Sequence, residues 1–143
     1  MIKRGFTIPG KAQAKQRPRF NSKLKRTYTP ERTINYENWV KTCYLDKYYG
    51  AEKIRNPIKV RIIAYYDIPK STSKKKQKQM LDNEIFPTIK PDTDNIAKSI
   101  LDSLNGIAYL DDKQVVKLEV EKYYSISANV TVMIEELEVE NNV

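Results

Sequence analysis

The sequence has no histidine and a single cysteine, Cys43, among its 143 residues. The absence of histidine excludes Ser-His-Asp and Cys-His catalysis, a zinc-binding HExxH motif and a histidine proton shuttle. One cysteine cannot form a disulfide framework or a cysteine-rich zinc or iron–sulfur site within the chain. Any chemistry must therefore come from carboxylates, lysines, arginines and hydroxyls. Oxygen ligands of this kind suit Mg²⁺, Mn²⁺ or Ca²⁺ rather than zinc or copper.

Long apolar segments are also missing. No run approaches the roughly 20 residues that a membrane-spanning helix requires, and the first residues lack the apolar stretch of a secretory signal. Hydrophobic residues make up 40% and charged residues 31%, which is typical of a globular protein rather than a disordered one. We therefore expect a cytoplasmic protein, and the length predicts one domain over residues 1–143.

The positive charge is concentrated near the start of the chain. Residues 1–32 hold ten lysines and arginines against one acid, Glu31, and a second basic run extends from Lys70 to Lys78. From residue 111 onward the sign reverses, with eight acids against three lysines. A basic front and an acidic rear predict a polyanionic partner, with nucleic acid as the default. For the run at 70–78 alone, a solvated loop with a turn or two of helix is the simpler expectation.

The hydrophobic pattern predicts the element order β-α-β-α-β-β. Strands are expected at 2–9, 58–66, 115–123 and 129–137, and residues 10–28 show no helical or strand period and are expected to form a long loop. One helix is expected to start with Thr29 as N-cap and Pro30 as its first residue and to stop near Gly50; a second should occupy about 93–104. These elements predict an α+β two-layer sandwich, in which a small mixed β-sheet, closed by an antiparallel pair of the last two strands, packs against two main helices.

The second predicted helix begins with two carboxylates. Pro91 keeps the residue before it out of the helical region, so Asp92 becomes the N-cap and Asp94 falls in the first turn, near the positive end of the helix dipole. Lys98 and Asp102 follow Asp94 at four-residue spacing. Taken alone, this pattern favours ordinary helix-start chemistry and an i,i+4 ion pair.

A second acidic pair, Asp111-Asp112, follows an apolar turn and precedes the strand predicted at 115–123. One of its carboxylates could point back toward Asp92 and Asp94, although a turn or a helix cap is an equally good interpretation. Three converging carboxylates beside a basic surface would bind Mg²⁺ and hold a phosphodiester. The metal would activate water, and a lysine would stabilise the charged oxygen.

Three sequence segments together carry a resemblance to a known family. They are Lys90-Pro91-Asp92-x-Asp94-Asn95-x-x-Lys98, Leu101-Asp102-x-Leu104-Asn105-Gly106 and Asp111-Asp112-x-Gln114-Val115-Val116. This combination closely resembles the RusA family of Holliday junction resolvases. The upstream segments Lys15-Gln16-Arg17-Pro18-Arg19 and Tyr28-Thr29-Pro30 are similar to the amino-terminal pattern of its phage and prophage members.

The resemblance implies a small homodimeric endonuclease, dependent on Mg²⁺ with Mn²⁺ as an alternative, that makes paired nicks across a four-way DNA junction. Its metal ligands fall on Asp92, Asp94 and Asp112, with Asp111 as the alternative to Asp112. A catalytic or DNA-contacting lysine falls on Lys98. We expect the following residues to contact the DNA backbone: Lys15, Arg17, Arg19 and Lys98. The resemblance also implies a bacterial host cell and a phage- or prophage-encoded protein.

Two rival functions share these sequence features. A protein that binds branched or single-stranded DNA without cutting it would keep the basic front and use the aspartates only as caps. A nuclease of the same family could also act on a flap or a replication fork. A homodimer fits the junction-resolving endonuclease, because two symmetric nicks need two active sites about one two-fold axis.

Overall fold

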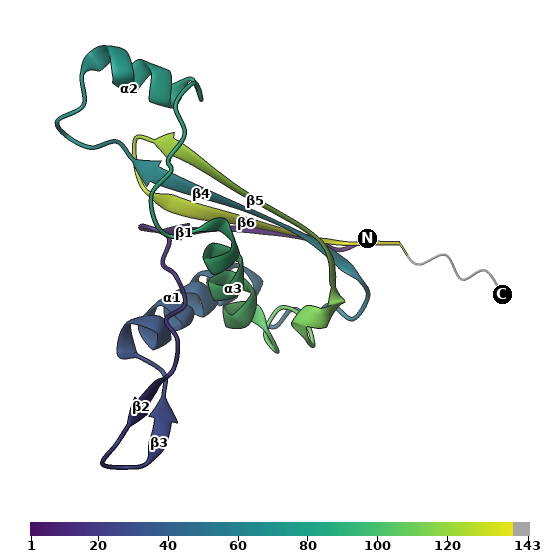
Figure 1. Ribbon diagram of the computed structural model, residues 1–143. Helices are drawn as coiled ribbons and strands as arrows, with labels where there is room; N and C mark the ends of the chain where they lie inside the picture. Colours follow the sequence, from purple (N-terminus) through teal and green to yellow (C-terminus); the bar gives the residue numbers. More distant parts are fainter. Residues whose placement is uncertain (139–143) are drawn as a thin grey trace.

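The structure, a computed structural model, describes residues 1–138 and is built around a four-stranded mixed sheet. The strands β1 (Lys3–Pro9), β4 (Ile58–Asp67), β5 (Val115–Ser125) and β6 (Asn129–Glu136) lie in the order β1-β6-β4-β5 (Figure 1). Helices α1 (Glu31–Tyr48) and α3 (Thr93–Leu104) pack on the sheet, α1 beside β1 and α3 beside β5. The predicted α+β arrangement of a mixed sheet against two main helices is confirmed.

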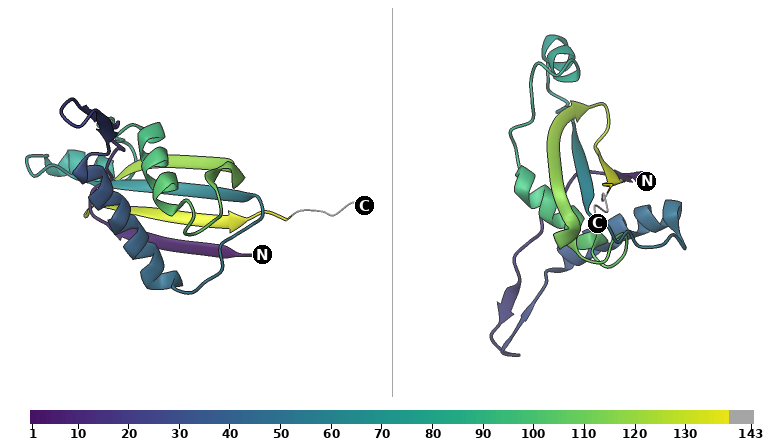
Figure 2. Two further views of the ribbon diagram at one scale, coloured as in Figure 1. Left: turned by 90° about the horizontal axis from the view of Figure 1, so that it is seen from below. Right: turned by 90° about the vertical axis from the view of Figure 1, so that its right-hand side faces the viewer.

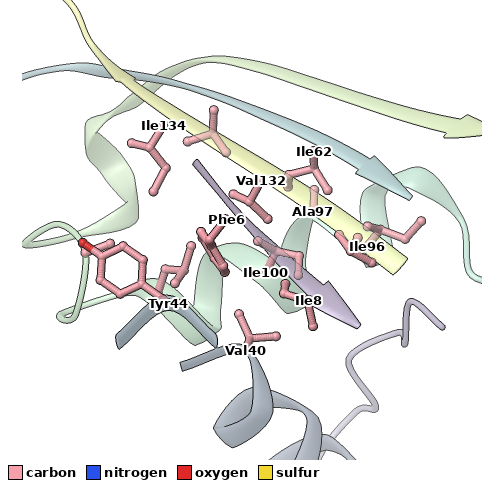
Figure 3. Close-up of a cluster of buried hydrophobic side chains, with 14 of the residues drawn as sticks. Phe6, Ile8, Val40, Tyr44, Ile62, Ile96, Ala97, Ile100, Val132 and Ile134 are labelled. Carbon is pink, nitrogen blue, oxygen red and sulfur yellow. The ribbon is translucent and has the colours of Figure 1, made fainter. Parts of the chain in front are cut away.

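Alternation along the strands builds the core between sheet and helices. Phe6 and Ile8 of β1 face inward, as do the even-numbered residues of β4 from Ile58 to Tyr66. Figure 3 shows Val132 and Ile134 of β6 meeting Ile96 and Ile100 of α3 and Val40 and Tyr44 of α1. Each fully buried aliphatic side chain contributes about 1.5–3 kcal/mol. The core therefore fixes the rotation of α3, and the polar side of that helix faces solvent.

The last two strands do not form the antiparallel pair that the sequence predicted. β4 lies between them, parallel to β5 (Ile62 opposite Val120) and antiparallel to β6 (Ile62 opposite Val132). Burial explains the order. The residues of β4 are the most apolar of the four strands and take a central position, whereas β5 is largely exposed at the edge. The three residues 126–128 cross the end of β4 to connect its two neighbours.

Residues 10–28 contain a hairpin where a long loop was expected. β2 (Arg19–Asn21) pairs antiparallel with β3 (Arg26–Tyr28), and the hairpin projects away from the sheet just before α1 (Figures 1 and 2). The Asn21 side-chain oxygen accepts hydrogen bonds from the backbone N–H groups of Lys23 and Leu24, at 3.0 and 3.1 Å, and so closes the turn. The strands are three residues each, too short to leave a period in the sequence.

Helix α1 begins one residue later than predicted. Pro30, not Thr29, is the N-cap, and its carbonyl oxygen accepts from the N–H groups of Thr33 and Ile34. The chain leaves the helix through Gly50 at a positive φ of 79°, so the predicted stop near Gly50 is confirmed.

The basic run at 70–78 forms most of a short helix, α2 (Lys74–Leu81), which agrees with the expected turn or two of helix. α2 buries none of its residues and lies at the opposite end of the molecule from the β2–β3 hairpin (Figure 1). Over residues 1–138, none of the helices combines the length and the apolar character needed to cross a membrane.

Candidate active site

The start of α3 presents the first group of predicted site residues. Asp92 is the N-cap residue, as predicted, although its side chain makes no capping hydrogen bond, and Asp94 lies in the first turn. Asp92, Asp94 and Lys98 are all exposed, because the apolar face of α3 is turned into the core. The α3 boundaries match the prediction from Thr93 to Leu104.

The Tyr66 hydroxyl of β4 holds the backbone at the start of α3. It donates a hydrogen bond of 3.3 Å to the carbonyl oxygen of the buried Pro91, immediately before Asp92. Burial, and to a smaller extent the charge of Asp92, raises the pKa of Tyr66 to about 12. Tyr66 therefore stays protonated at neutral pH and remains a donor that holds the backbone at the start of the helix.

A surface cleft joins the start of α3 to the basic loop that precedes the hairpin. Its walls are residues 15–18 on one side and Asp94, Asn95 and Lys98 on the other. Arg17, Arg19 and Lys98 are exposed, and among residues 1–138 none of the three forms an ion pair. The cleft thus brings a carboxylate and uncompensated cations together at one place.

Lys15 is held inside this region by two acids. Its Nζ lies 2.6 Å from Asp102 Oδ2 of α3 and 3.5 Å from Glu37 Oε1 of α1, and its side chain is 26% exposed. The hydrogen bond to Asp102, followed by the charges of Asp102 and Glu37, raises the pKa of Lys15 against the opposing effect of burial. Lys15 ties the loop to both helices. A contact with DNA stays a prediction for this residue.

Replacing Lys15 by methionine is expected to destabilise the protein by about 1–2 kcal/mol, because it leaves two partly buried carboxylates without their cation. Urea unfolding at pH 7 would measure the loss. Because the pKa of Lys15 is raised in the folded protein, its ion pairs stabilise the fold fully at every pH below the ordinary lysine pKa. This stabilisation is lost only as the pH rises through the raised pKa. Lys11→Met, at an exposed lysine of the same loop, is the matched control and should change the stability by less than about 0.5 kcal/mol. Equal effects of the two changes would contradict the assignment.

The two carboxylates of the second acidic pair have different roles, because a turn uses Asp111 but not Asp112 as its cap. Asp111 caps a short 3₁₀ turn (Asp112–Gln114), with its Oδ1 accepting from the N–H of Lys113 at 2.9 Å. The Gln114 side chain completes the capping box by accepting from the N–H of Asp111 at 2.9 Å. The backbone hydrogen bond from Lys113 lowers the pKa of Asp111. Asp111 is therefore already used by the turn, as the cap interpretation predicted.

Asp112 has a different environment. Partial desolvation raises its pKa, and the neighbouring Asp111 and the charge of Asp102 add to the effect. It is the member of the pair whose carboxylate does not serve as the cap. A carboxylate that is not used as a cap is an oxygen donor of the kind that a divalent cation favours.

The predicted convergence of Asp92, Asp94 and Asp112 is not present in the single chain. Within residues 1–138, the structure contains no group of three or more acidic or cysteine side chains close enough together to hold a metal ion. The charge of Asp102, which lies two turns beyond Asp94 on α3, contributes to the raised pKa of Asp112. The donors fit Mg²⁺ in kind, but residues 1–138 of a single chain do not bring the full set together.

Three contributors to this region were not singled out as site residues from the sequence. Asp102 was noted for its four-residue spacing from Lys98, and its link to Lys15 spans 87 positions and has no local signal. Tyr66 was one residue of an apolar strand. Phe20 interrupts the basic loop directly after Arg19, and its position among cationic residues is the one local signal that could have indicated its exposure.

Comparison with known proteins identifies the family. A model of the family described as Endodeoxyribonuclease RusA matches residues 9–135, which include the acidic segments, the cleft and the hairpin. The chain belongs to the RusA family. It is also 34% identical over 136 residues to the "Uncharacterized protein YqaN" of Bacillus subtilis (strain 168), covering 92% of this chain and 95% of that protein. RusA proteins are endodeoxyribonucleases that resolve Holliday junctions, so the family accounts for a basic surface beside exposed carboxylates.

Proposed function

We propose that this RusA-family protein is a divalent-metal-dependent endonuclease that resolves four-way DNA junctions by paired symmetric phosphodiester hydrolysis, in recombination and repair. The observation that carries the proposal is the cleft in which Asp94 and Lys98 face the loop at 15–18, in a chain matched by the family over residues 9–135. We further propose one domain over residues 1–143, acting as a homodimer in the cytoplasm of a bacterial cell and encoded by a phage or prophage.

The proposed roles follow the chemistry of the side chains. Asp92, Asp94 and Asp112 would supply ligands to Mg²⁺ or Mn²⁺ once they are brought closer together than they lie in the free chain; the ion, when bound, would supply an activated water and neutralise charge on the phosphate. The Lys98 ammonium, one turn beyond Asp94 and exposed in the cleft, would bind a non-bridging oxygen of the scissile phosphate. Asp112 is preferred over Asp111 because Asp111 already caps the 3₁₀ turn.

DNA binding would begin at the basic side of the cleft. Arg17 and Arg19 are exposed and would contact phosphates on either side of the scissile bond, with Lys15 fixing the loop that carries them. Neutralising phosphates releases condensed counterions, which makes such binding strong and dependent on salt. A homodimer would present two such clefts, as paired nicks require.

A binding protein that cuts nothing is the alternative from another class. It is favoured by one observation: the described chain does not gather three carboxylates. Under that alternative the aspartates act only as helix and turn caps, and added Mg²⁺ would affect binding through screening alone. A flap or a replication fork as substrate is a narrower alternative within the same enzyme class.

The deciding experiment is a nicking assay with the purified wild-type protein on a synthetic four-way junction, a flap, a fork and a linear duplex. We expect paired nicks placed symmetrically across the junction in Mg²⁺, none in EDTA, and little cleavage of the linear duplex. Binding to the junction without cleavage in either Mg²⁺ or Mn²⁺ would reject the nuclease and leave the binding protein. Preferred cleavage of the flap or fork would reject the junction as substrate.

A further inference from the structure

The β2–β3 hairpin carries three large, exposed apolar side chains that lie outside the hydrophobic core of residues 1–138. Phe20 is 63% exposed, Leu24 58% and Tyr28 46%, and the hairpin projects away from the sheet in Figure 1 and in the right-hand view of Figure 2. A two-stranded hairpin is marginally stable by itself. Three large apolar side chains on such an element indicate a surface that is completed by a partner.

The register of the hairpin places an aromatic ring on each of its faces. Arg19 lies opposite Tyr28, and Phe20 lies opposite Thr27. Because successive residues of a strand point to opposite faces, Tyr28 shares one face with Arg19 and Arg26, and Phe20 lies on the other. The hairpin is thus a thin two-stranded blade, aromatic on both faces and basic along its length.

The charge of the hairpin indicates the class of partner. Residues 11–30 contain seven lysines and arginines and no acid. A second copy of the same hairpin would be repelled, whereas a polyanion would be attracted. Aromatic rings between cations suit nucleic acid in particular, because bases stack on the rings while phosphates pair with the cations.

The hairpin is also fixed in position beside the cleft. The segment entering it is anchored by the Lys15–Asp102 ion pair of 2.6 Å and by the hydrogen bond from Gln16 N–H to Thr33 Oγ1 of 3.0 Å. The segment leaving it runs directly into α1. DNA held at Asp94 and Lys98 would therefore meet the hairpin at a set distance and direction.

We propose that the β2–β3 hairpin inserts its aromatic side chains at the branch point of the DNA junction, where Phe20 and Tyr28 stack on bases that lack a stacking neighbour. Arg19 and Arg26 then neutralise the phosphates of the strands that diverge there. At a branch point the stack is already interrupted, so an apolar wedge enters at a lower cost than in a continuous duplex. The inference rests on the proposed function for its substrate, and it assigns the preference for branched DNA to the hairpin rather than to the acidic cleft.

The test compares the binding of a labelled four-way junction and of a linear duplex, by fluorescence anisotropy in EDTA so that no cleavage occurs. For the double variant Phe20→Ala/Tyr28→Ala we expect at least about tenfold weaker junction binding, since base–aromatic stacking of this kind is lost, and less than about twofold change on the duplex. A 2-aminopurine base at the branch point should report stacking with the wild-type protein and lose that signal with the double variant. Phe20→Trp should keep the junction preference.

Two controls separate stacking from other effects. Tyr49→Ala removes an aromatic side chain that is 88% exposed at the far end of α1, and it should leave binding to both DNAs unchanged. The double variant Arg19→Gln/Arg26→Gln should weaken binding to both DNAs together and reduce the salt dependence. The aromatic positions are exposed and lie outside the core, so their replacement should leave the unfolding transition in place.

Three results would overturn the inference. The aromatic double variant could bind the junction as well as the wild type does, or it could lose the same amount of affinity for junction and duplex. The third is that, without DNA, the double variant differs from the wild type in molecular mass in solution. The last would assign the hairpin to contacts between copies of the chain. The nicking assay distinguishes this failure from that of the proposed function. If the wild type nicks junctions and the double variant still prefers junction to duplex, only the hairpin inference is lost. If the wild type nicks no DNA but its preference for the junction still depends on the aromatic side chains, only the proposed nuclease is lost.

Discussion

Replacing Asp112 by asparagine is expected to lower the rate of junction nicking at least about 100-fold, whereas the same change at Asp111 should lower it less than about tenfold. The two residues are adjacent, but only Asp111 is used as a cap, with Oδ1 accepting from Lys113 N–H. Asparagine is as good a cap as aspartate, so Asp111→Asn keeps the turn. Asp112→Asn removes the negative charge of a carboxylate that the turn does not use as its cap.

Single-turnover nicking with saturating protein would measure this difference, because it separates the chemical step from DNA affinity. Asp94→Asn should behave like Asp112→Asn. Both variants should bind the junction as well as the wild type does, since each removes a negative charge near the phosphates. A larger loss of nicking rate for Asp111→Asn than for Asp112→Asn would assign the metal-ligand role to Asp111 instead. Full nicking activity of all three variants would reject these carboxylates as the metal site and leave them as caps.

The largest expected loss of stability follows from Ile100→Ala. Ile100 is 1% exposed and lies in the core between α3, β1 and α1, where Figure 3 shows it near Ile8 and Val40. Removing three carbons there loses the transfer free energy and leaves a cavity, which together cost about 3–4 kcal/mol. For a chain of this size the melting temperature should fall by roughly 10 °C.

Ile126→Ala is the matched control, because the same atoms are removed at a position that is 87% exposed in the turn between β5 and β6. Its cost should stay below about 0.5 kcal/mol. Calorimetry and urea unfolding of both variants would provide the comparison. A small effect of Ile100→Ala would mean that α3 does not depend on this packing, and the orientation of Asp94 and Lys98 would then need another explanation.

Local signals explain why the most important helix could be predicted to its exact ends. Pro91 and Asp92 mark its start, Asn105-Gly106 marks its end, and the buried residues between follow the helical period. The placement of Asp92 at the cap and Asp94 in the first turn followed from the same signals. The family motif directed attention to Asp112, but the sequence did not separate Asp112 from Asp111. That distinction came from the hydrogen bonds of the turn.

Two of the features that the sequence did not predict depend on contacts between distant segments, and the third, the hairpin, is local. The loop at 126–128 is short enough for a hairpin, and local pattern alone favours one; β4 separates the two strands because its buried residues need neighbours on both sides. Lys15 was expected at the DNA because nothing in its surroundings along the chain reveals Asp102 or Glu37. The hairpin was missed because its turn is closed by one side chain, Asn21, rather than by a glycine motif.

The insertion of β6 between β1 and β4 has a consequence for how the protein folds. β1 pairs with a strand at least 120 residues away, from Pro9 opposite Asn129 to Lys3 opposite Glu135. β1 and the β4–β5 pair have no hydrogen bonds between them until β6 is present. The entropy of closing such long loops is lost before the pairing repays it, so we expect folding to be slow for a chain of this length. During synthesis β1, β4 and β5 emerge first and expose unpaired edges. A chaperone that shields β1 and β4 until β6 emerges would therefore raise the yield of native protein more than one that acts later.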